Sequence, residues 1–451
     1  MRKVLVITGD TIAPKMAGPA IRASEIAREL SLSCDVRLAS TSAASDIGLD
    51  IPVVMASGRA LKRHVEWADI IVFQGFILAS NPWIARAGKT LVADLYDPLH
   101  LEHLADSQRS SVKKKNDGIS ETTAVLTHQI RHADFFICAS EKQRDLWIGY
   151  LSAVGRVNAA VYADDSSLRK LIDVVPFGIS ENPPVLSRHA IRDSFDGIEP
   201  TDKVILWGGG IYNWFDPLTL ISAVNLLVRS RPNVRLLFLG VTHPNAVFSE
   251  FEMATKAMAL SHELNLTNRA VFFNQSWVDY SDRENYLLDA DLGVSTHFTH
   301  LETAYSFRTR ILDYLWAGLP IVSTEGDTFA DYISKFGLGR VVKEGDSEGL
   351  AQALEELLFN EKSIQSATTA VANFRGQFGW SRAVGPLRNF CLEGRKAPDI
   401  LRGTLRLPLK FPRETWVRGK LRGARLALKA GGAKLVLQKL FGREPLNEWP
   451  N

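Results

Sequence analysis

The chain has 451 residues, 46% hydrophobic and 23% charged, and a net charge of +3, which is the composition of a globular protein of more than one domain. The three cysteines, Cys34, Cys138 and Cys391, are far apart and lack a metal-ligand spacing, which argues against a disulfide scaffold or a zinc module. The chain opens with a strand pattern instead of a signal peptide and has no apolar run of about 18 residues, so we expect a cytoplasmic protein without a membrane-spanning helix.

Short apolar segments alternate with helical patterns in the first half of the chain. A helix is expected over residues 20–30, and strands are expected at KVLVIT, DVRLAS, IPVVMA, DIIVFQG, TLVADLYD, ADFFICAS and IDVVPFG. This alternation predicts a parallel, doubly wound α/β sheet in residues 1–178. Gly9 and Gly18 do not form a GxGxxG motif, so a dinucleotide-binding domain is not indicated.

The alternation begins again after residues 179–200, a segment with three prolines that we interpret as a linker. Residues 201–380 carry helical patterns between strand patterns at KVILWGGG, VRLLFLG, RAVFFNQ, LGVSTHF, PIVST and GRVVK. The sequence therefore predicts two α/β domains. Ligands bind outside the carboxyl ends of the strands in such sheets, so two facing domains would enclose a cleft.

Three loops at these strand ends carry residues that suit a ligand. The glycines at 208–210 let the backbone approach a phosphate closely. Trp277 follows another strand and suits either packing against a base or a structural role. Asp97 is placed for acid/base or hydroxyl-orienting chemistry, or for capping the turn before Pro98. The nearby residues 100–103, HLEH, lack a standard ligand spacing, so no metal site is expected.

The segment HLETAYSFRTRILDYLWAGLPIVST, residues 300–324, contains a helical pattern that ends at Gly318. Arg308 and Arg310 lie at its start, where free N–H groups and the helix dipole favour an anion. Their planar guanidinium groups match a phosphate. Asp313, one turn later, is placed to bind both hydroxyls of a ribose. The pattern suggests a nucleotide site, although a solvated helix start with scattered arginines gives the same sequence.

These residues resemble the nucleotide-sugar domain of the GT-B glycosyltransferases, specifically the group 1 family that is also called GT4. The similar segments are VVPFGIS, VILWGGG, VFFNQSWV, YLLDADLGVST and ETAYSFRTRILDYLWAGLPIVST, and SRAVGPLRNFCL resembles the helix that crosses back to the first domain in this fold. The resemblance implies two Rossmann-like domains facing across a cleft: an acceptor-side domain at 1–178, a nucleotide-sugar domain at 201–380 and a cross-over helix at 381–395.

The resemblance also assigns residues around the donor. Asp313 falls where the family's second carboxylate binds ribose. Tyr305 stands where the first carboxylate should be, and Glu302 is its substitute in our interpretation. Ser306 and Phe307, together with the arginine that follows them, occupy the stretch whose backbone touches the donor.

The family's Arg and Lys after the second domain's glycine are missing from the segment that follows Gly209 and Gly210. We infer that Arg308 and Arg310 replace this charge on the diphosphate. On the acceptor side, Gly18 matches the family's glycine loop. Tyr96 and Asp97 stand where many members have a histidine near the reacting sugar.

The resemblance implies transfer of a sugar from a nucleotide-diphosphate-sugar donor to a hydroxyl of a lipid-linked or polysaccharide acceptor in cell-surface glycan biosynthesis. Members generally retain the anomeric configuration and need no bound metal or other cofactor, because protein cations stabilise the leaving diphosphate. Two other functions fit the same sequence: a GT-B nucleotide-sugar epimerase, and a catalytically silent, membrane-associated binding protein.

The end of the chain is strongly basic. Residues 396–451 carry 13 Lys and Arg against 4 Asp and Glu, a net charge of +9 that leaves −6 on the first 395 residues. Within this tail, residues 415–441 place apolar side chains roughly along one face of a helix and basic ones largely elsewhere. Such a helix binds an anionic membrane surface, so peripheral attachment to the inner face of the cytoplasmic membrane is one interpretation and a solvated tail is another. Nucleic-acid binding is not expected, because stacking aromatic residues are not interleaved with the basic ones.

Overall fold

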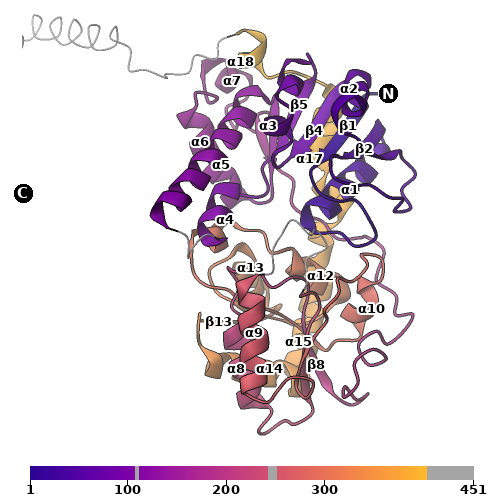
Figure 1. Cartoon of the computed structure of the whole chain (residues 1–451), viewed down its shortest axis with the longest axis vertical. Coiled ribbons are helices and arrows are strands. Elements are labelled where there is room, and N and C mark those ends of the chain that lie inside the picture. Colours follow the sequence, from indigo (N-terminus) through magenta and orange to yellow (C-terminus); the bar gives the residue numbers. More distant parts are fainter. Residues whose placement is uncertain (107–110, 242–250, 404–451) are drawn as a thin grey trace, which may run out of the picture. The chain divides into compact units, whose positions relative to one another are not determined.

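The structure is a computed structural model that describes residues 1–106, 111–241 and 251–403. Both sheets belong to one compact unit, Met1–Thr404 (Figure 1). Across the described residues, no helix combines the length and the apolar character that crossing a membrane requires. The basic segment at 415–441 lies outside the described residues, so its amphipathic helix stays a prediction.

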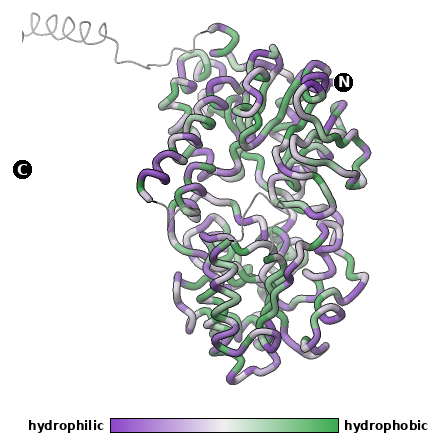
Figure 2. The backbone as a smooth tube through the Cα atoms, in the orientation of Figure 1, coloured by the Kyte–Doolittle hydropathy of each residue, from purple (hydrophilic) through white to green (hydrophobic). Residues whose placement is uncertain are grey.

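The first half contains a seven-stranded parallel sheet with the strand order β3-β2-β1-β4-β5-β6-β7. Each of the seven expected strand segments contains one of its strands, which are β1 Lys3–Thr8, β2 Asp35–Ser40, β3 Val53–Met55, β4 Ile70–Gln74, β5 Thr90–Asp94, β6 Phe135–Cys138 and β7 Ile172–Val174. Figure 2 shows hydrophobic residues concentrated along these strands. Val4 and Val6 of β1 belong to one buried core, whereas Leu5 and Ile7 belong to another. Apolar side chains are therefore buried on both faces, as in other parallel sheets.

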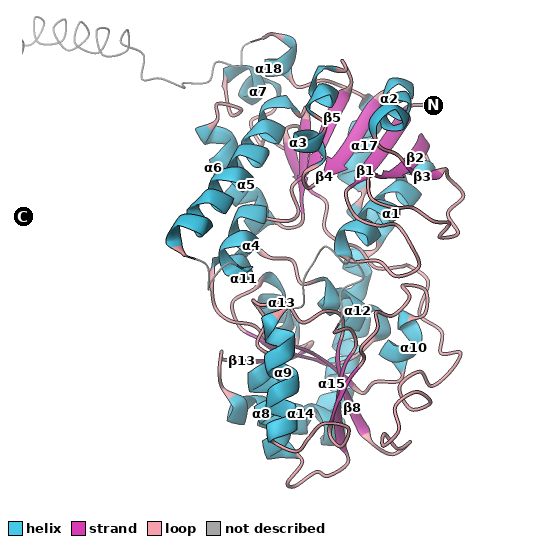
Figure 3. Ribbon diagram, in the orientation of Figure 1, coloured by secondary structure: helices cyan, strands magenta, loops and turns pink. Residues whose placement is uncertain are grey.

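Helices connect the strands of this sheet and cover its faces (Figure 3). They are α1 Gly18–Ser31, α2 Gly58–Trp67, α3 Ile77–Ser80, the 3-10 helix η1 Pro82–Arg86, α4 Leu99–Asp106, α5 Val112–His132, α6 Glu141–Ala153 and α7 Ala159–Asp164. Gly118 lets α4 and α5 pack closely, because a Cβ there would lie 2.0 Å from the His103 Nε2 atom. This packing positions the helix that follows the carboxyl end of β5.

The second half contains a six-stranded parallel sheet with the order β10-β9-β8-β11-β12-β13. Its strands are β8 Lys203–Trp207, β9 Val234–Phe238, β10 Val271–Phe273, β11 Leu292–Ser295, β12 Ile321–Thr324 and β13 Gly339–Val342. The helices that follow β8 are α8 Pro217–Leu227, α9 Glu252–Glu263, α10 Arg283–Leu288, α11 Leu301–Tyr305, α12 Thr309–Ala317, α13 Thr328–Phe336, α14 Ser347–Phe359, α15 Glu361–Phe374, η2 Arg375–Phe378, α16 Trp380–Ala383, α17 Gly385–Glu393 and α18 Pro398–Leu401. The sequence analysis did not predict α11, α13, α15, η2 or α18.

Helix α12 ends where the sequence predicts. Gly318 follows it in the left-handed region, with φ of 77°, and the N–H of Leu319 donates to the carbonyl of Tyr314. Ile311 and Leu315 are fully buried on the face that packs into the core. Because glycine adopts positive φ without strain, the chain turns at once into β12.

The last described helices return to the first half of the chain. Figure 1 shows α17, in the yellow-orange of the chain end, among the indigo and purple elements of that half. Phe390 of α17 stacks on Phe135 of β6, with ring centroids 4.4 Å apart. Asp399 of α18 is fully buried and accepts a hydrogen bond from Arg156 Nε at 2.7 Å.

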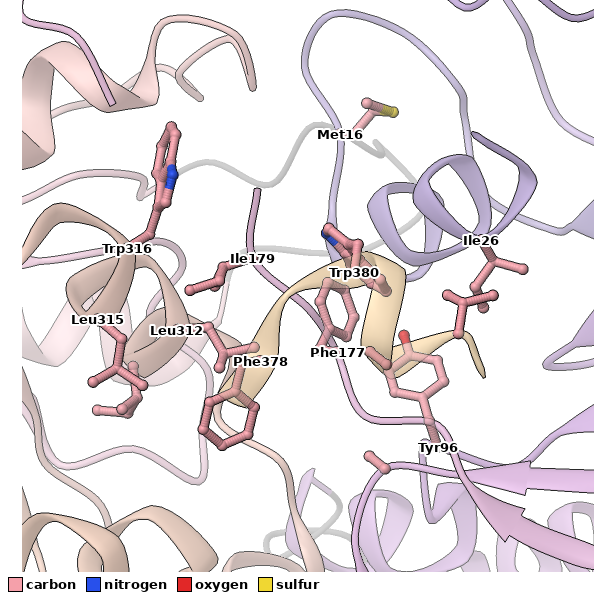
Figure 4. Close-up of a cluster of buried hydrophobic side chains, with 14 of the residues drawn as sticks. Met16, Ile26, Tyr96, Phe177, Ile179, Leu312, Leu315, Trp316, Phe378 and Trp380 are labelled. Atoms are coloured by element: carbon pink, nitrogen blue, oxygen red, sulfur yellow. The ribbon is translucent and has the colours of Figure 1, made fainter. Parts of the chain in front are cut away.

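One hydrophobic cluster contains side chains from both halves and from the returning segment. Trp380 packs on Phe177 with ring centroids 5.4 Å apart, and a Cβ at Gly178 would lie 2.5 Å from the Trp380 ring. Figure 4 shows Leu312 and Phe378 in the same cluster. The cluster lies beside α12, so it helps to position the helix that carries the candidate site.

Candidate functional site

Two adjoining pockets lie at the carboxyl ends of the strands, near the points where the strand order reverses, between β1 and β4 and between β8 and β11. The first, which we call the glycine pocket, is lined by residues of both halves and encloses about 1070 Å³, including space open to solvent. The second, the acidic pocket, encloses about 1490 Å³ by the same measure. Gly18, Tyr212, Thr309 and Arg310 line both pockets.

The glycine pocket is named for the turn Gly208–Gly210, which follows β8. Gly209 has φ of 96°, a conformation that strongly favours glycine, and the space beside its Cα is open. The N–H of Gly208 donates to the Tyr314 hydroxyl at 2.7 Å, which ties the turn to α12. The turn therefore presents bare backbone to the pocket, as a close approach to phosphate requires.

Trp277 forms one wall of the glycine pocket. It packs against glycines, because a Cβ at Gly240 would lie 3.0 Å from its ring and a Cβ at Gly210 would lie 3.3 Å away. Its indole N–H donates to the carbonyl of Met16 at 3.0 Å, and the N–H of Tyr280 donates to the carbonyl of Pro14 at 2.9 Å. Trp277 thus has a structural role, joining the loops after β1 and β10, while it also lines the space expected for a base.

Arg310 lies where the two pockets meet and is 7% exposed. Its Nη2 donates to the carbonyl of Gly210 at 2.8 Å, and the guanidinium lies over the rings of Trp207 and Phe215, at 4.2 and 4.1 Å. Among the residues that the structure describes, Nη1 has no hydrogen-bond partner. Burial, helped by the charge of Arg308, lowers the pKa of Arg310 to about 10, so the group remains charged at neutral pH.

Arg308 is also buried, at 5% exposed, but its charge is balanced. Its Nη1 and Nη2 donate to the two carboxylate oxygens of Glu302 at 2.9 and 2.8 Å, and Nη2 also reaches Thr303 Oγ1 at 3.1 Å. Glu302 comes from α11, the short helix that the sequence analysis did not predict. The two arginines lie together at the start of α12, but Arg308 is paired with a carboxylate whereas Arg310, among the described residues, is not.

Asp313 faces the glycine pocket from α12 and already has a partner. Its Oδ1 accepts from Arg283 Nε at 3.2 Å. The guanidinium of Arg283 lies over the rings of Tyr280 and Trp316, at 3.7 and 4.5 Å. The Asp313 side chain is 38% exposed, so it remains partly accessible beside its partner.

Asp97 lines the acidic pocket together with Glu102 of α4. Burial raises the pKa of Asp97 to about 7, and the charge of Asp94 adds to this, while a hydrogen bond from Tyr96 opposes it. Burial also raises the pKa of Glu102, and the neighbouring charges of Asp97 and Glu302 act in the same direction. The two carboxyl groups therefore hold a proton near neutral pH, so together they both donate and accept hydrogen bonds.

The first half also buries an arginine, close enough to Asp97 for its charge to oppose the rise in that pKa. Arg22 of α1 is fully buried and donates to both oxygens of Asp94, from Nε at 2.6 Å and from Nη2 at 3.0 Å. Nη2 also donates to the carbonyl of Val175 at 2.8 Å. The sequence analysis missed this pair, because an arginine within a helix and an aspartate at a strand end give no local signal of their partnership.

The remaining predicted residues lie at or beside the two pockets. Gly18 is the first residue of α1. Ser306 is buried and donates from Oγ to the carbonyl of Thr303 at 3.1 Å. Phe307 lines the acidic pocket and packs on Phe329 of α13, with ring centroids 4.8 Å apart. No group of three or more His, Cys, Asp or Glu within residues 1–106, 111–241 and 251–403 has an arrangement that could hold a metal ion.

Three residues that the sequence analysis gave no role also belong to the site. Arg283 is the partner of Asp313, Tyr212 lines both pockets, and Asp10 lines the acidic pocket. Tyr212 comes two residues after the glycine turn, so an aromatic residue close behind such a turn is the signal that could have revealed it.

Known proteins were compared with the chain at three levels. Residues 202–360 match the model of a family described as glycosyl transferases group 1. A sequence search of curated proteins finds no match. Among solved structures, Anabaena Alr3699/HepE in complex with UDP and glucose has a TM-score of 0.64 at 17% identity, over 87% of this chain and 100% of that chain.

Two further solved structures have the same fold. WaaG, a glycosyltransferase involved in lipopolysaccharide biosynthesis, has a TM-score of 0.59 at 18% identity, over 88% of this chain and 100% of that one. Sucrose-phosphate synthase from Thermosynechococcus elongatus has a TM-score of 0.62 at 15% identity, over 87% of this chain and 98% of that one. The two parallel sheets and these structures confirm the predicted fold: the chain has the GT-B fold, and its residues 202–360 match the model of the group 1 glycosyltransferases, as the resemblance implies.

Proposed function

We propose that the protein transfers a sugar from a nucleotide-diphosphate-sugar donor to a hydroxyl of an acceptor. The observation that carries this proposal is Arg310, a buried and charged guanidinium that faces both pockets and is paired with no carboxylate among the described residues. Burying a charge is costly unless an opposite charge balances it. A diphosphate bound at this position would supply that balance.

The donor would extend through both pockets. The nucleoside occupies the glycine pocket, with the base beside Trp277 and the ribose at Asp313. The diphosphate lies at the start of α12, where it meets Arg310 and the backbone of Gly209 and Gly210. The transferred sugar enters the acidic pocket, near the Glu302–Arg308 pair. The structure of Alr3699/HepE in complex with UDP-glucose, which shares the fold, supports a nucleotide sugar as the partner.

The proposed chemistry is retaining and independent of a metal ion. The bond between the anomeric carbon and the diphosphate oxygen breaks, and the acceptor oxygen bonds to that carbon on the same face. The acceptor proton passes to the departing phosphate oxygen. Arg310 and the dipole of α12 stabilise the charge that develops on the leaving group, and Asp97 orients the reacting hydroxyls. Closure of the pockets excludes water that would hydrolyse the donor.

We propose a lipid-linked or polysaccharide acceptor in cell-surface glycan biosynthesis, reached from the cytoplasmic face of a membrane to which residues 415–441 attach. Full-length protein and a version that ends at Gly403 should differ in co-sedimentation with anionic liposomes. The truncation at Gly403 keeps Asp399, which is bonded to buried Arg156, so the folded unit is undisturbed. Equal binding of the two versions would contradict membrane attachment through the tail.

The test of transfer is a thermal-shift panel of UDP, GDP, ADP, CMP and dTDP, followed by turnover of the matching nucleotide sugars with and without EDTA. One nucleotide should raise the melting temperature, and its sugar conjugate should be turned over equally in EDTA. Release of an altered sugar without any acceptor would instead indicate an epimerase. No binding and no turnover with any donor would indicate a silent binding protein.

A further inference from the structure

We propose that the acceptor group that enters the acidic pocket is an uncharged sugar ring, with no phosphate next to the reacting hydroxyl. The inference rests on the proposed function, which does not specify whether the acceptor group is charged. Three features of the pocket lead to it: its charge, its unpaired donors and its aromatic wall.

The charged groups of the acidic pocket do not favour a second anion beside the donor diphosphate. Arg308 is already bound to Glu302 through both terminal nitrogens. Arg310 lies at the junction with the glycine pocket, where the donor diphosphate would bind. The described lining offers no other lysine or arginine, whereas Asp97 and Glu102 face the same space. The two carboxyl groups share one proton and so keep a negative charge, and an acceptor phosphate would meet that charge without a lysine or arginine of its own, a contact between like charges that is unfavourable.

The hydrogen-bonding groups of the pocket match hydroxyls. Carboxylate oxygens accept hydrogen bonds, which the hydroxyls of a sugar donate. The Nε–H of Arg308, on a side chain that is 5% exposed, has no hydrogen-bond partner among the described residues and can donate in return. A hydroxyl both donates and accepts, so a polyhydroxylated ring satisfies the carboxyl oxygens as well as the Arg308 donor, whereas a phosphate, which mainly accepts, would leave the carboxyl oxygens unpaired.

The wall of the pocket is aromatic. Trp214 stacks on Tyr212 with ring centroids 5.0 Å apart and an angle of 14° between the planes. Phe76, from the first half, is 44% exposed and lines the same pocket. Rigid aromatic faces beside a few polar groups are a common way to bind and orient a small molecule. The C–H face of a sugar ring fits against such a wall, while its hydroxyls reach the carboxyl groups.

The inference is tested by comparing methyl glycosides of glucose, galactose and mannose with the corresponding 6-phosphates as acceptors for full-length protein. Donor hydrolysis without acceptor, and its inhibition by each compound, are measured in parallel. We expect at least one neutral glycoside to be used or bound about tenfold better than its phosphate, by kcat/KM or by inhibition constant. Phosphates that perform as well as neutral glycosides, or no binding of any neutral glycoside, would overturn the inference.

Charge at the pocket is then tested directly. The double variant Asp97→Asn with Glu102→Gln removes the negative charge that the two carboxyl groups share and should reduce the discrimination against the phosphates. Glu121→Gln removes the same charge from the exposed face of α5, outside the pocket lining, and should leave the discrimination unchanged. Equal behaviour of the two variants would count against the inference. Failure of every nucleotide sugar to bind or to be turned over, with or without an acceptor, would instead overturn the proposed function, so the two failures are distinguishable.

Discussion

Each half of the molecule buries an arginine against aromatic rings, and one of the two is paired with a carboxylate while the other is not, among the described residues. In the first half, Arg22 lies over Tyr96 at 4.7 Å and is bonded to both oxygens of Asp94. In the second half, Arg310 lies over Trp207 and Phe215 and bonds to a carbonyl. Among the described residues, no ion pair balances Arg310.

The comparison separates a structural charge from a functional one. Both guanidinium groups have an Nη1 without a hydrogen-bond partner among the described residues, but the charge of Arg22 is balanced by a bidentate carboxylate, so it attracts an anionic ligand only weakly. A guanidinium buried without a carboxylate raises the free energy of the folded protein until an anion arrives. Arg22 should therefore matter for stability, and Arg310 should matter for binding and catalysis.

The largest expected effect is on folding. Arg22→Ala leaves Asp94 buried without its partner, so the free energy of unfolding should fall by about 3–5 kcal/mol. Urea denaturation followed by circular dichroism measures this change. The double variant Arg22→Met with Asp94→Leu removes both charges and should recover most of the loss. An unchanged urea midpoint for Arg22→Ala would show that the pair does not hold the first half together.

The next effect is on turnover. Arg310→Ala should lower kcat by about 10²–10³-fold, as removal of an anion-stabilising donor does, which corresponds to about 2.7–4 kcal/mol. Its melting temperature without nucleotide should stay level or rise, because an uncompensated charge is removed. Arg310→Lys keeps the charge and should retain more activity than the alanine variant. Unchanged turnover of Arg310→Ala would show that Arg310 does not stabilise the leaving group.

A smaller effect is expected for the balanced arginine of the second half. Arg308→Met and Glu302→Leu, made singly and together, should show a coupling of about 0.5–3 kcal/mol in the free energy of unfolding. Each single variant leaves a buried charge, whereas the double variant leaves none. Additive effects on stability would mean that Arg308, like Arg310, is available to a ligand.

The smallest effect concerns pH. The pKa of Asp97 is raised from 3.8 to about 7, so the folded protein holds a proton that the unfolded chain releases at lower pH. The contribution of Asp97 to stability is therefore fully present below 3.8 and is lost as the pH rises through about 7. Asp97→Asn should raise the melting temperature relative to the parent protein more at pH 8 than at pH 5. The same gain at both pH values would contradict the raised pKa.

Much of the fold follows from local sequence patterns. The strand segments are buried on both faces, so they appear as continuous apolar runs that periodicity can find. The end of α12 follows from Gly318, because a positive φ is a local requirement that glycine meets. The short helix α11 carries too few residues for a helical period to show, so it was not predicted.

The partners within the site could not be predicted in the same way. The sequence placed Arg308, Arg310 and Asp313 on one helix start, but not the carboxylate that holds Arg308 or the arginine that holds Asp313. Glu302 lies six residues before Arg308 and Arg283 lies thirty before Asp313. Both pairings depend on how α10, α11 and α12 pack, which is a tertiary property. The tail at 415–441 lies outside the described residues, so its prediction stays untested.

The two hydrogen bonds that join the loops after β1 and β10, from Trp277 to Met16 and from Tyr280 to Pro14, bear on how fast a nucleotide arrives. Separating the loops after β1 and β10, which line the glycine pocket, would break both hydrogen bonds, at a net cost of about 1–3 kcal/mol. A widened form then makes up roughly 1–20% of the molecules at equilibrium. If the proposed nucleotide enters on this side, its association rate would be reduced by the same fraction, and the closed majority would retain a nucleotide that has already entered.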